Sequence, residues 1–155
     1  MDNLFLEVFP DIKVDNKTYE MLENCRVIKI SRSSSSNNVR IFIESDYLIQ
    51  FRTIEKIVKA LSKAYFEDAV VDIVPSFRLS SQYNLMNLWN EYADTVLLEI
   101  KKKSGILHTI LSRGEICFED PNTMYVLIEE GMVSEIHASR ILKALNTLLC
   151  LRCNI

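Results

Sequence analysis

The stretch LIQFRTIEKIVKALSKAYFEDAVVDIVPSF, residues 48–77, contains two periodicities that decide the fold. In its first part, apolar residues recur at helical spacing from Ile54 to Tyr65, so we expect a helix over residues 49–66. Residues 69–74 then form a short β-branched run closed by Pro75, which is typical of a buried strand. The stretch therefore predicts one helix packed on one central strand, to which the rest of the chain adds layers.

A second stripe on the predicted helix is basic. Its members follow one another at steps of four, three and four residues: Arg52, Lys56, Lys59 and Lys63. Such a row can follow a phosphate backbone. A solvated helix face, with Glu55 paired to Lys59 at i,i+4, produces the same pattern.

Cations of the first predicted hairpin can extend this basic surface, or they can be outward strand positions that alternate with apolar ones. These cations are Lys29, Arg32 and Arg40. The candidate nucleic-acid-binding residues are therefore Arg52, Lys56, Lys59, Lys63, Lys29 and Arg40. The cations at 101–103 are interpreted instead as charges at the end of a helix, where they favour its dipole.

Composition narrows the class of protein. The chain has 155 residues, 48% hydrophobic and 25% charged, with a net charge of −3, which argues against a broad cationic surface. No apolar run approaches the roughly 18 residues of a membrane-spanning helix. The N-terminus, MDNLFLEVFPD, carries acids and lacks the basic start of a secretory signal. The expected compartment is the cytoplasm, with no membrane contact.

Catalytic and metal-binding motifs are missing from the sequence. Its three glycines form no phosphate loop, no GxGxxG and no GxSxG, and its two histidines form no HExxH. Cys150 and Cys153 form a CxxC, but a zinc site needs a second pair, and Cys25 and Cys117 stand singly in apolar runs. We therefore expect no catalytic residue, no cofactor and no metal.

The remaining elements are expected as two hairpins and further helices. The hairpins pair 26–32 with 39–45 and 115–119 with 123–128, and a long helix capped by Ser80 or Ser81 lies between them. A last helix starts at Ser134, with Ile136 among its buried residues. The fold class is therefore α+β, with a mixed, largely antiparallel sheet from two hairpins plus a central strand, and helices packed on one face. We expect a single domain over 1–155, in which the long helix 81–103 joins the halves 1–77 and 112–149.

Three aromatic residues lie on or near the long helix: Tyr83, Trp89 and Tyr92. Such rings can form a stacking platform for bases. Trp89 and Tyr92 share helical spacing with apolar residues, which favours a core stripe instead. Tyr83 is expected to be the most exposed of the three.

Three segments in succession resemble the N-terminal region of PolC, the DNA polymerase III α subunit that carries its own proofreading exonuclease. They are ENCRVIKISRSSSSNNVRIFIESDYLI, RTIEKIVKALSKAYFEDAVVDIVPSF and YNLMNLWNEYADTVLLEIKKKSG, and the resemblance runs from about Leu4 to Leu149. It implies a fragment without the polymerase and exonuclease parts. The region is non-catalytic in that family, is associated with the clamp-loader τ subunit, and has been likened to a KH-type nucleic-acid module.

Two functions are therefore expected. The first is a non-catalytic docking domain that contacts the clamp-loader τ subunit or another replisome protein in DNA replication and assists DNA binding. Leu4, Phe5, Phe9 and the C-terminal helix are the candidates for its exposed apolar surface. The alternative is a KH-like module for single-stranded nucleic acid, although the GxxG loop of a KH domain is absent.

Overall fold

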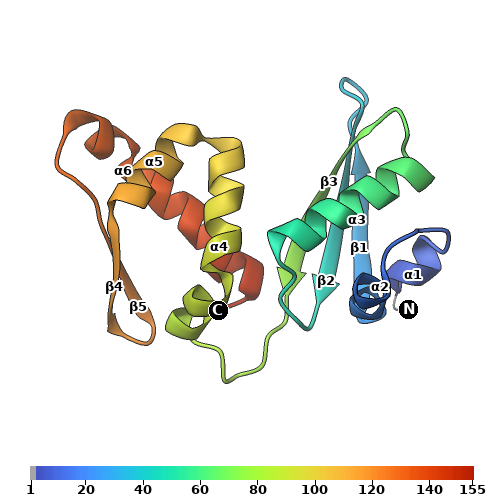
Figure 1. The fold of residues 1–155 in the computed structure, drawn as a ribbon, viewed down its shortest axis with the longest axis horizontal. Helices are drawn as coiled ribbons and strands as arrows, with labels where there is room; N and C mark the ends of the chain where they lie inside the picture. The colour runs from blue at the N-terminus through green and yellow to red at the C-terminus, as the bar shows by residue number, and fades with distance from the viewer. Residues whose placement is uncertain (1–2) are drawn as a thin grey trace. The chain divides into compact units, whose positions relative to one another are not determined.

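The computed structural model describes residues 3–155, apart from the side chains of residues 132 and 133. It divides into two compact units, Met1–Arg78 and Leu79–Ile155. The long helix expected to join two halves lies within the second unit (Figure 1). Both units combine helices with strands, so the α+β class predicted from the sequence is confirmed.

The first unit is built on a three-stranded sheet in the order β1-β2-β3. Its strands are β1 Cys25–Arg32, β2 Asn38–Ser45 and β3 Val70–Phe77. β1 and β2 form the predicted hairpin, with a register shift between Val27 and Lys29. β2 and β3 run parallel because helix α3, Phe51–Ala64, carries the chain from the end of one strand to the start of the other.

One face of this sheet carries the core of the first unit. Side chains alternate between buried and exposed along β2 and β3, as the pleat of a strand requires. On the buried face lie Val39, Ile41, Ile43, Val71, Ile73 and Phe77. The apolar stripe of α3 is also buried, at Ile54, Ile57 and Leu61. Helix α3 therefore packs on this face with the stripe that its periodicity predicted.

The N-terminal segment completes the same layer. Leu4 forms an antiparallel bridge with Arg26, and the short helices α1 Phe5–Val8 and α2 Asn16–Leu22 follow. Phe9 stacks edge-on against Tyr65 at the end of α3, with ring centroids 5.2 Å apart. Phe5 and Phe9 are only 0% and 4% exposed. The expectation that they form an exposed docking surface was therefore wrong.

Strand β3 differs from its prediction in two ways. It continues through Pro75 to Phe77, and it lies at the edge of the sheet rather than at its centre. The N–H groups of Val70 and Arg78 both donate to the β2 side. Because donor direction alternates along a strand, the position of Pro75 faces the free edge, so its missing N–H removes no hydrogen bond from the sheet.

The second unit has three helices and a hairpin. Helices α4 Leu85–Lys103 and α5 Gly105–Arg113 meet at Ser104, whose hydroxyl caps α5. The hairpin β4 Glu115–Asp120 and β5 Thr123–Leu127 follows. Helix α6, Met132–Leu145, continues as a π-helical segment, Asn146–Leu151.

Two helix starts in this unit differ from the prediction. Asn84 caps α4 by accepting a hydrogen bond from the Asn87 N–H, so neither Ser80 nor Ser81 is the cap. Helix α6 starts after Gly131 rather than at Ser134. Ile136 is 65% exposed and not buried as expected, whereas Ile141 and Leu145 are in the core.

Candidate nucleic-acid and protein interface

The four predicted cations of α3 form a continuous row on the outer face of the helix. Arg52, Lys56, Lys59 and Lys63 are all exposed, opposite the buried Ile54, Ile57 and Leu61. The first and last cations are 11 residues apart, which gives the row a length of roughly 16 Å at the α-helical rise. We call these four residues the α3 basic row.

Most of this row is not neutralised by protein carboxylates. Lys56 Nζ lies 3.8 Å from Asp15 Oδ2. Asp15 is also the cap of α2, and its hydrogen bond from the Thr18 N–H, with a smaller contribution from Lys56, lowers its pKa. Within residues 3–155, Arg52, Lys59 and Lys63 form no ion pair, and the expected pair of Glu55 with Lys59 is not made. Three of the four cations are therefore available to an external anion.

Lys29 and Arg40 do not join this row. Arg40 lies between the buried Val39 and Ile41 on β2, so its side chain is on the sheet face away from α3. Lys29 is paired in register with Phe42 of that face. The structure therefore divides the six predicted site residues between two surfaces, the helix row and the open sheet face.

The open sheet face has an aromatic centre. Phe42 lies between Lys29 on β1 and Val74 on β3 in one row across the sheet. The Lys29 ammonium sits 5.3 Å from the centroid of the Phe42 ring, within the range of a cation–π contact. Phe42 and Val74 are both half-buried, although α3 covers the opposite face. The centre of this face is thus apolar and partly exposed to solvent.

Paired charges surround this centre. At one end, Glu44 is 3.0 Å from Arg26 and 3.0 Å from Arg78, and Arg26 also contacts Asp46 at 3.1 Å. At the other end, Arg40 lies 3.9 Å from Asp72. Hydrogen bonds to Asp46 and Glu44 raise the pKa of Arg26. The three arginines of this face, Arg26, Arg40 and Arg78, are therefore matched by carboxylates.

The three aromatic residues near α4 differ in burial, because Tyr92 is buried whereas Tyr83 and Trp89 are half-buried. Tyr92 is 0% exposed, and its hydroxyl accepts a hydrogen bond from Arg152 at 3.2 Å. Arg152 also forms a partly buried ion pair with Glu99 at 2.5 Å, which links the C-terminal turn to α4. Burial raises the pKa of Tyr92. Tyr83 is half-buried and donates its hydroxyl to Glu91. Tyr92 is therefore a core residue, as its helical spacing indicated.

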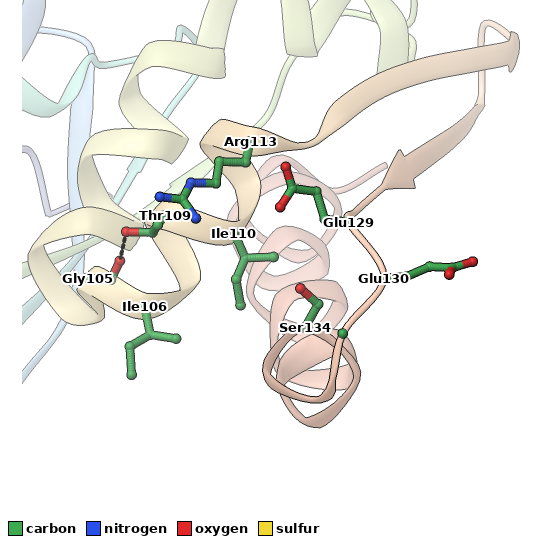
Figure 2. A pocket seen from close by; sticks show the side chains of 9 residues that line it. Gly105, Ile106, Thr109, Ile110, Arg113, Glu129, Glu130 and Ser134 are labelled. Carbon is green, nitrogen blue, oxygen red and sulfur yellow. Dashed lines mark hydrogen bonds between the residues drawn. The ribbon is translucent and has the colours of Figure 1, made fainter.

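The second unit has an open hollow of about 520 Å³ between α5 and the start of α6. Arg113, Glu129 and Glu130 line it, and all three are exposed. Figure 2 shows Arg113 lying beside Thr109, while the carboxyl groups of Glu129 and Glu130 point in different directions. The two carboxylates therefore do not converge on one point.

The cysteines are free thiols in different surroundings. Cys25 and Cys153 are buried, whereas Cys117 and Cys150 are half-buried. Over the part of the chain that the structure describes, no cluster of three or more histidine, cysteine or acidic side chains could hold a metal ion. Nor is any helix in that part long and apolar enough to cross a membrane.

The first unit is thus a small α+β module with one helix-covered face and one open sheet face. Residues 4–74, nearly all of this unit, match the family model of the DNA polymerase III polC-type N-terminus I. This match covers less than half of the chain, and it shows that the first unit is similar to the N-terminal regions of PolC-type DNA polymerase III. The resemblance inferred from the sequence is confirmed over this range, and its extension to Leu149 lies beyond the match. No curated protein and no solved structure matches the chain.

Sequence reasoning did not identify Phe42 or the charge network around Glu44. Phe42 stands at an alternating position of the return strand, which could have placed it on the outer face. The contact of Arg26 with Glu44 depends on the register of the hairpin. That register shifts between Val27 and Lys29, where two apolar residues, Val27 and Ile28, are adjacent in the sequence.

Proposed function

We propose that this chain is a non-catalytic accessory domain from the N-terminal region of a PolC-type replicative polymerase, and that it docks the clamp-loader τ subunit. The match of residues 4–74 supports the polymerase family and a place in DNA replication. The open carboxylates of the second unit offer no arrangement of an acid and a base around a common point. Attachment to a partner is therefore the function that the surfaces support best.

The observation that carries this proposal is the open sheet face of the first unit. Protein interfaces combine an apolar or aromatic centre with a polar rim. Phe42 and Val74 supply such a centre, and the pairs of Arg26 with Glu44 and Arg40 with Asp72 supply the rim. Because the rim charges are already paired, docking on this face does not bury an unpaired charge.

The KH-like alternative has less support. In a KH domain a GxxG loop clamps the nucleic-acid backbone. Here a single helix, α3, joins β2 to β3, and the three glycines of the chain all lie in the second unit. A contact with nucleic acid in this unit would therefore have to rely on side-chain charge rather than on a glycine-rich backbone loop.

The docking proposal is tested by measuring the affinity of purified τ subunit for the chain and for a Phe42→Thr variant. Threonine keeps the strand propensity and removes the ring. We expect τ to bind the native chain and to bind the variant at least about tenfold more weakly, as for a central aromatic anchor. Tyr47→Thr is the matched control, because Tyr47 is 65% exposed and lies outside the strands. Equal affinities for the native chain and the Phe42 variant would refute the assignment of this face.

A further inference from the structure

The cations of the open sheet face and those of α3 differ in their electrostatic surroundings. On the open sheet face, Arg26, Arg40 and Arg78 each lie within 4 Å of a carboxylate, and Lys29 is placed over the Phe42 ring. On α3, only Lys56 has such a partner, at 3.8 Å, among the residues described. A polyanion that binds the sheet face must displace existing contacts, whereas one that binds α3 gains new ones.

From this asymmetry we infer that the α3 basic row is a binding path for the phosphate backbone of single-stranded DNA, separate from the docking face. The row consists of Arg52, Lys56, Lys59 and Lys63, and it excludes Lys29 and Arg40. The inference goes beyond the docking role, because it assigns a second ligand to a different surface of the same unit.

The shape of the row favours single-stranded DNA over duplex DNA. Its cations lie in a single file of roughly 16 Å along one convex helix, which fits a few successive phosphates. Beside Lys56 lies Asp15 at the start of α2, with its carboxylate 3.8 Å from the Lys56 ammonium. A second phosphate backbone on this side would therefore meet a carboxylate.

The two surfaces can be occupied at the same time. Helix α3 covers the face of the sheet that holds Ile41 and Ile73, and Phe42 and Val74 lie on the other face. A protein bound over Phe42 therefore does not cover the row. The first unit is suited to hold a protein partner on one side and a DNA strand on the other.

The test is a titration of the whole 155-residue chain with a fluorescent oligothymidylate at salt concentrations from about 50 to about 200 mM. Four phosphate contacts on a single strand predict a slope of log Kobs against log salt of about −2.8. In the Lys59→Gln, Lys63→Gln double variant the slope should fall to about −1.4. The matched control is Lys29→Gln, Arg40→Gln, which also removes two positive charges and should leave the slope near that of the native chain.

Each outcome decides the inference. A halved slope for the row variant with an unchanged slope for the sheet variant supports it. An equal reduction of the slope in both double variants would show that binding depends only on net charge, and this would overturn the inference. So would a lack of binding at the lowest salt, or tighter binding of a duplex of the same length. Because τ is absent from this titration, the result is independent of whether the docking proposal holds.

Discussion

Gly114 stands where α5 turns into β4, and the backbone around it leaves no space for a side chain. A Cβ built there would lie 2.5 Å from the carbonyl oxygen of Leu127 and 3.4 Å from that of Ile110. Because both neighbours are backbone atoms, the hairpin would have to move to admit a methyl group. The glycine is therefore required by close approach of the chain and not by its own backbone angles.

We predict that Gly114→Ala lowers the free energy of unfolding by roughly 1–3 kcal/mol, the range for overpacking. Gly105→Ala is the matched control, since a Cβ at Gly105 meets nothing within 4 Å. That change should be neutral or should stabilise by up to about 1 kcal/mol through the unfolded chain. Urea unfolding measures both variants. A Gly114 variant as stable as the native chain would contradict the close approach.

The C-terminal thiols are a second feature at the scale of the residue. Burial raises the pKa of Cys153 to about 12 and also raises the pKa of Cys150. A thiolate is the reactive form of cysteine, so neither thiol is activated. Burial therefore disfavours the thiolate form at both cysteines of the CxxC.

We predict that the second unit loses stability above about pH 9, the ordinary thiol value. The pKa of Cys153 is higher in the folded state, so the unfolded chain loses its proton first. Stability is full below the unfolded pKa and falls as pH rises toward about 12. Thermal unfolding across this range should show the fall, and Cys153→Ala should reduce it. A melting temperature that does not change between pH 8 and about pH 11 would contradict the raised pKa of Cys153 in the folded state.

At the scale of the element, β3 shows how the first sheet protects its edges. Its residues 70–77 form an eight-residue edge strand, and such strands invite pairing with other chains. Pro75 lies at a position whose N–H would face the free edge. The opposite edge strand, β1, has a register shift beside Lys29. A proline and a bulge are both devices that prevent strand addition.

Replacing this proline should expose the edge. We predict that Pro75→Val keeps the fold, changes the free energy of unfolding by no more than about 1 kcal/mol, and promotes self-association. Sedimentation velocity at increasing protein concentration measures the association. Val74→Thr serves as the comparison, because it changes a neighbouring side chain and leaves the proline in place. A Pro75 variant that stays as monodisperse as the native chain would show that the edge is protected by something else.

Local patterns predicted most elements of this chain. The alternation of 26–32 and 39–45 placed the first hairpin, and the apolar spacing of 49–66 placed α3. The helix starts two residues later and ends two residues earlier than this prediction. The patterns failed where tertiary context decided. Pro75 looked like the end of a strand because the sequence does not show which edge of a sheet is free. Likewise, the α3 cations were found by spacing, but their separation from Lys29 and Arg40 depends on the sheet.

On the scale of the whole molecule, the two units differ in what they present. The first unit, which holds the match to the PolC-type N-terminus, has an aromatic-centred sheet face and a basic helix row on opposite sides. The second unit has an open hollow with exposed charges and a partly buried ion pair between Arg152 and Glu99. The surfaces with a stated partner are therefore both in the unit that matches the family.

The measurement that tests this account most directly is the binding of purified τ subunit to two variants of the chain by calorimetry. The account predicts that Phe42→Thr weakens τ binding by about tenfold or more, and that the Lys59→Gln, Lys63→Gln variant binds τ as the native chain does. The opposite pattern, with τ binding lost in the row variant and kept in the Phe42 variant, would contradict the assignment of the sheet face to the protein partner and of α3 to DNA.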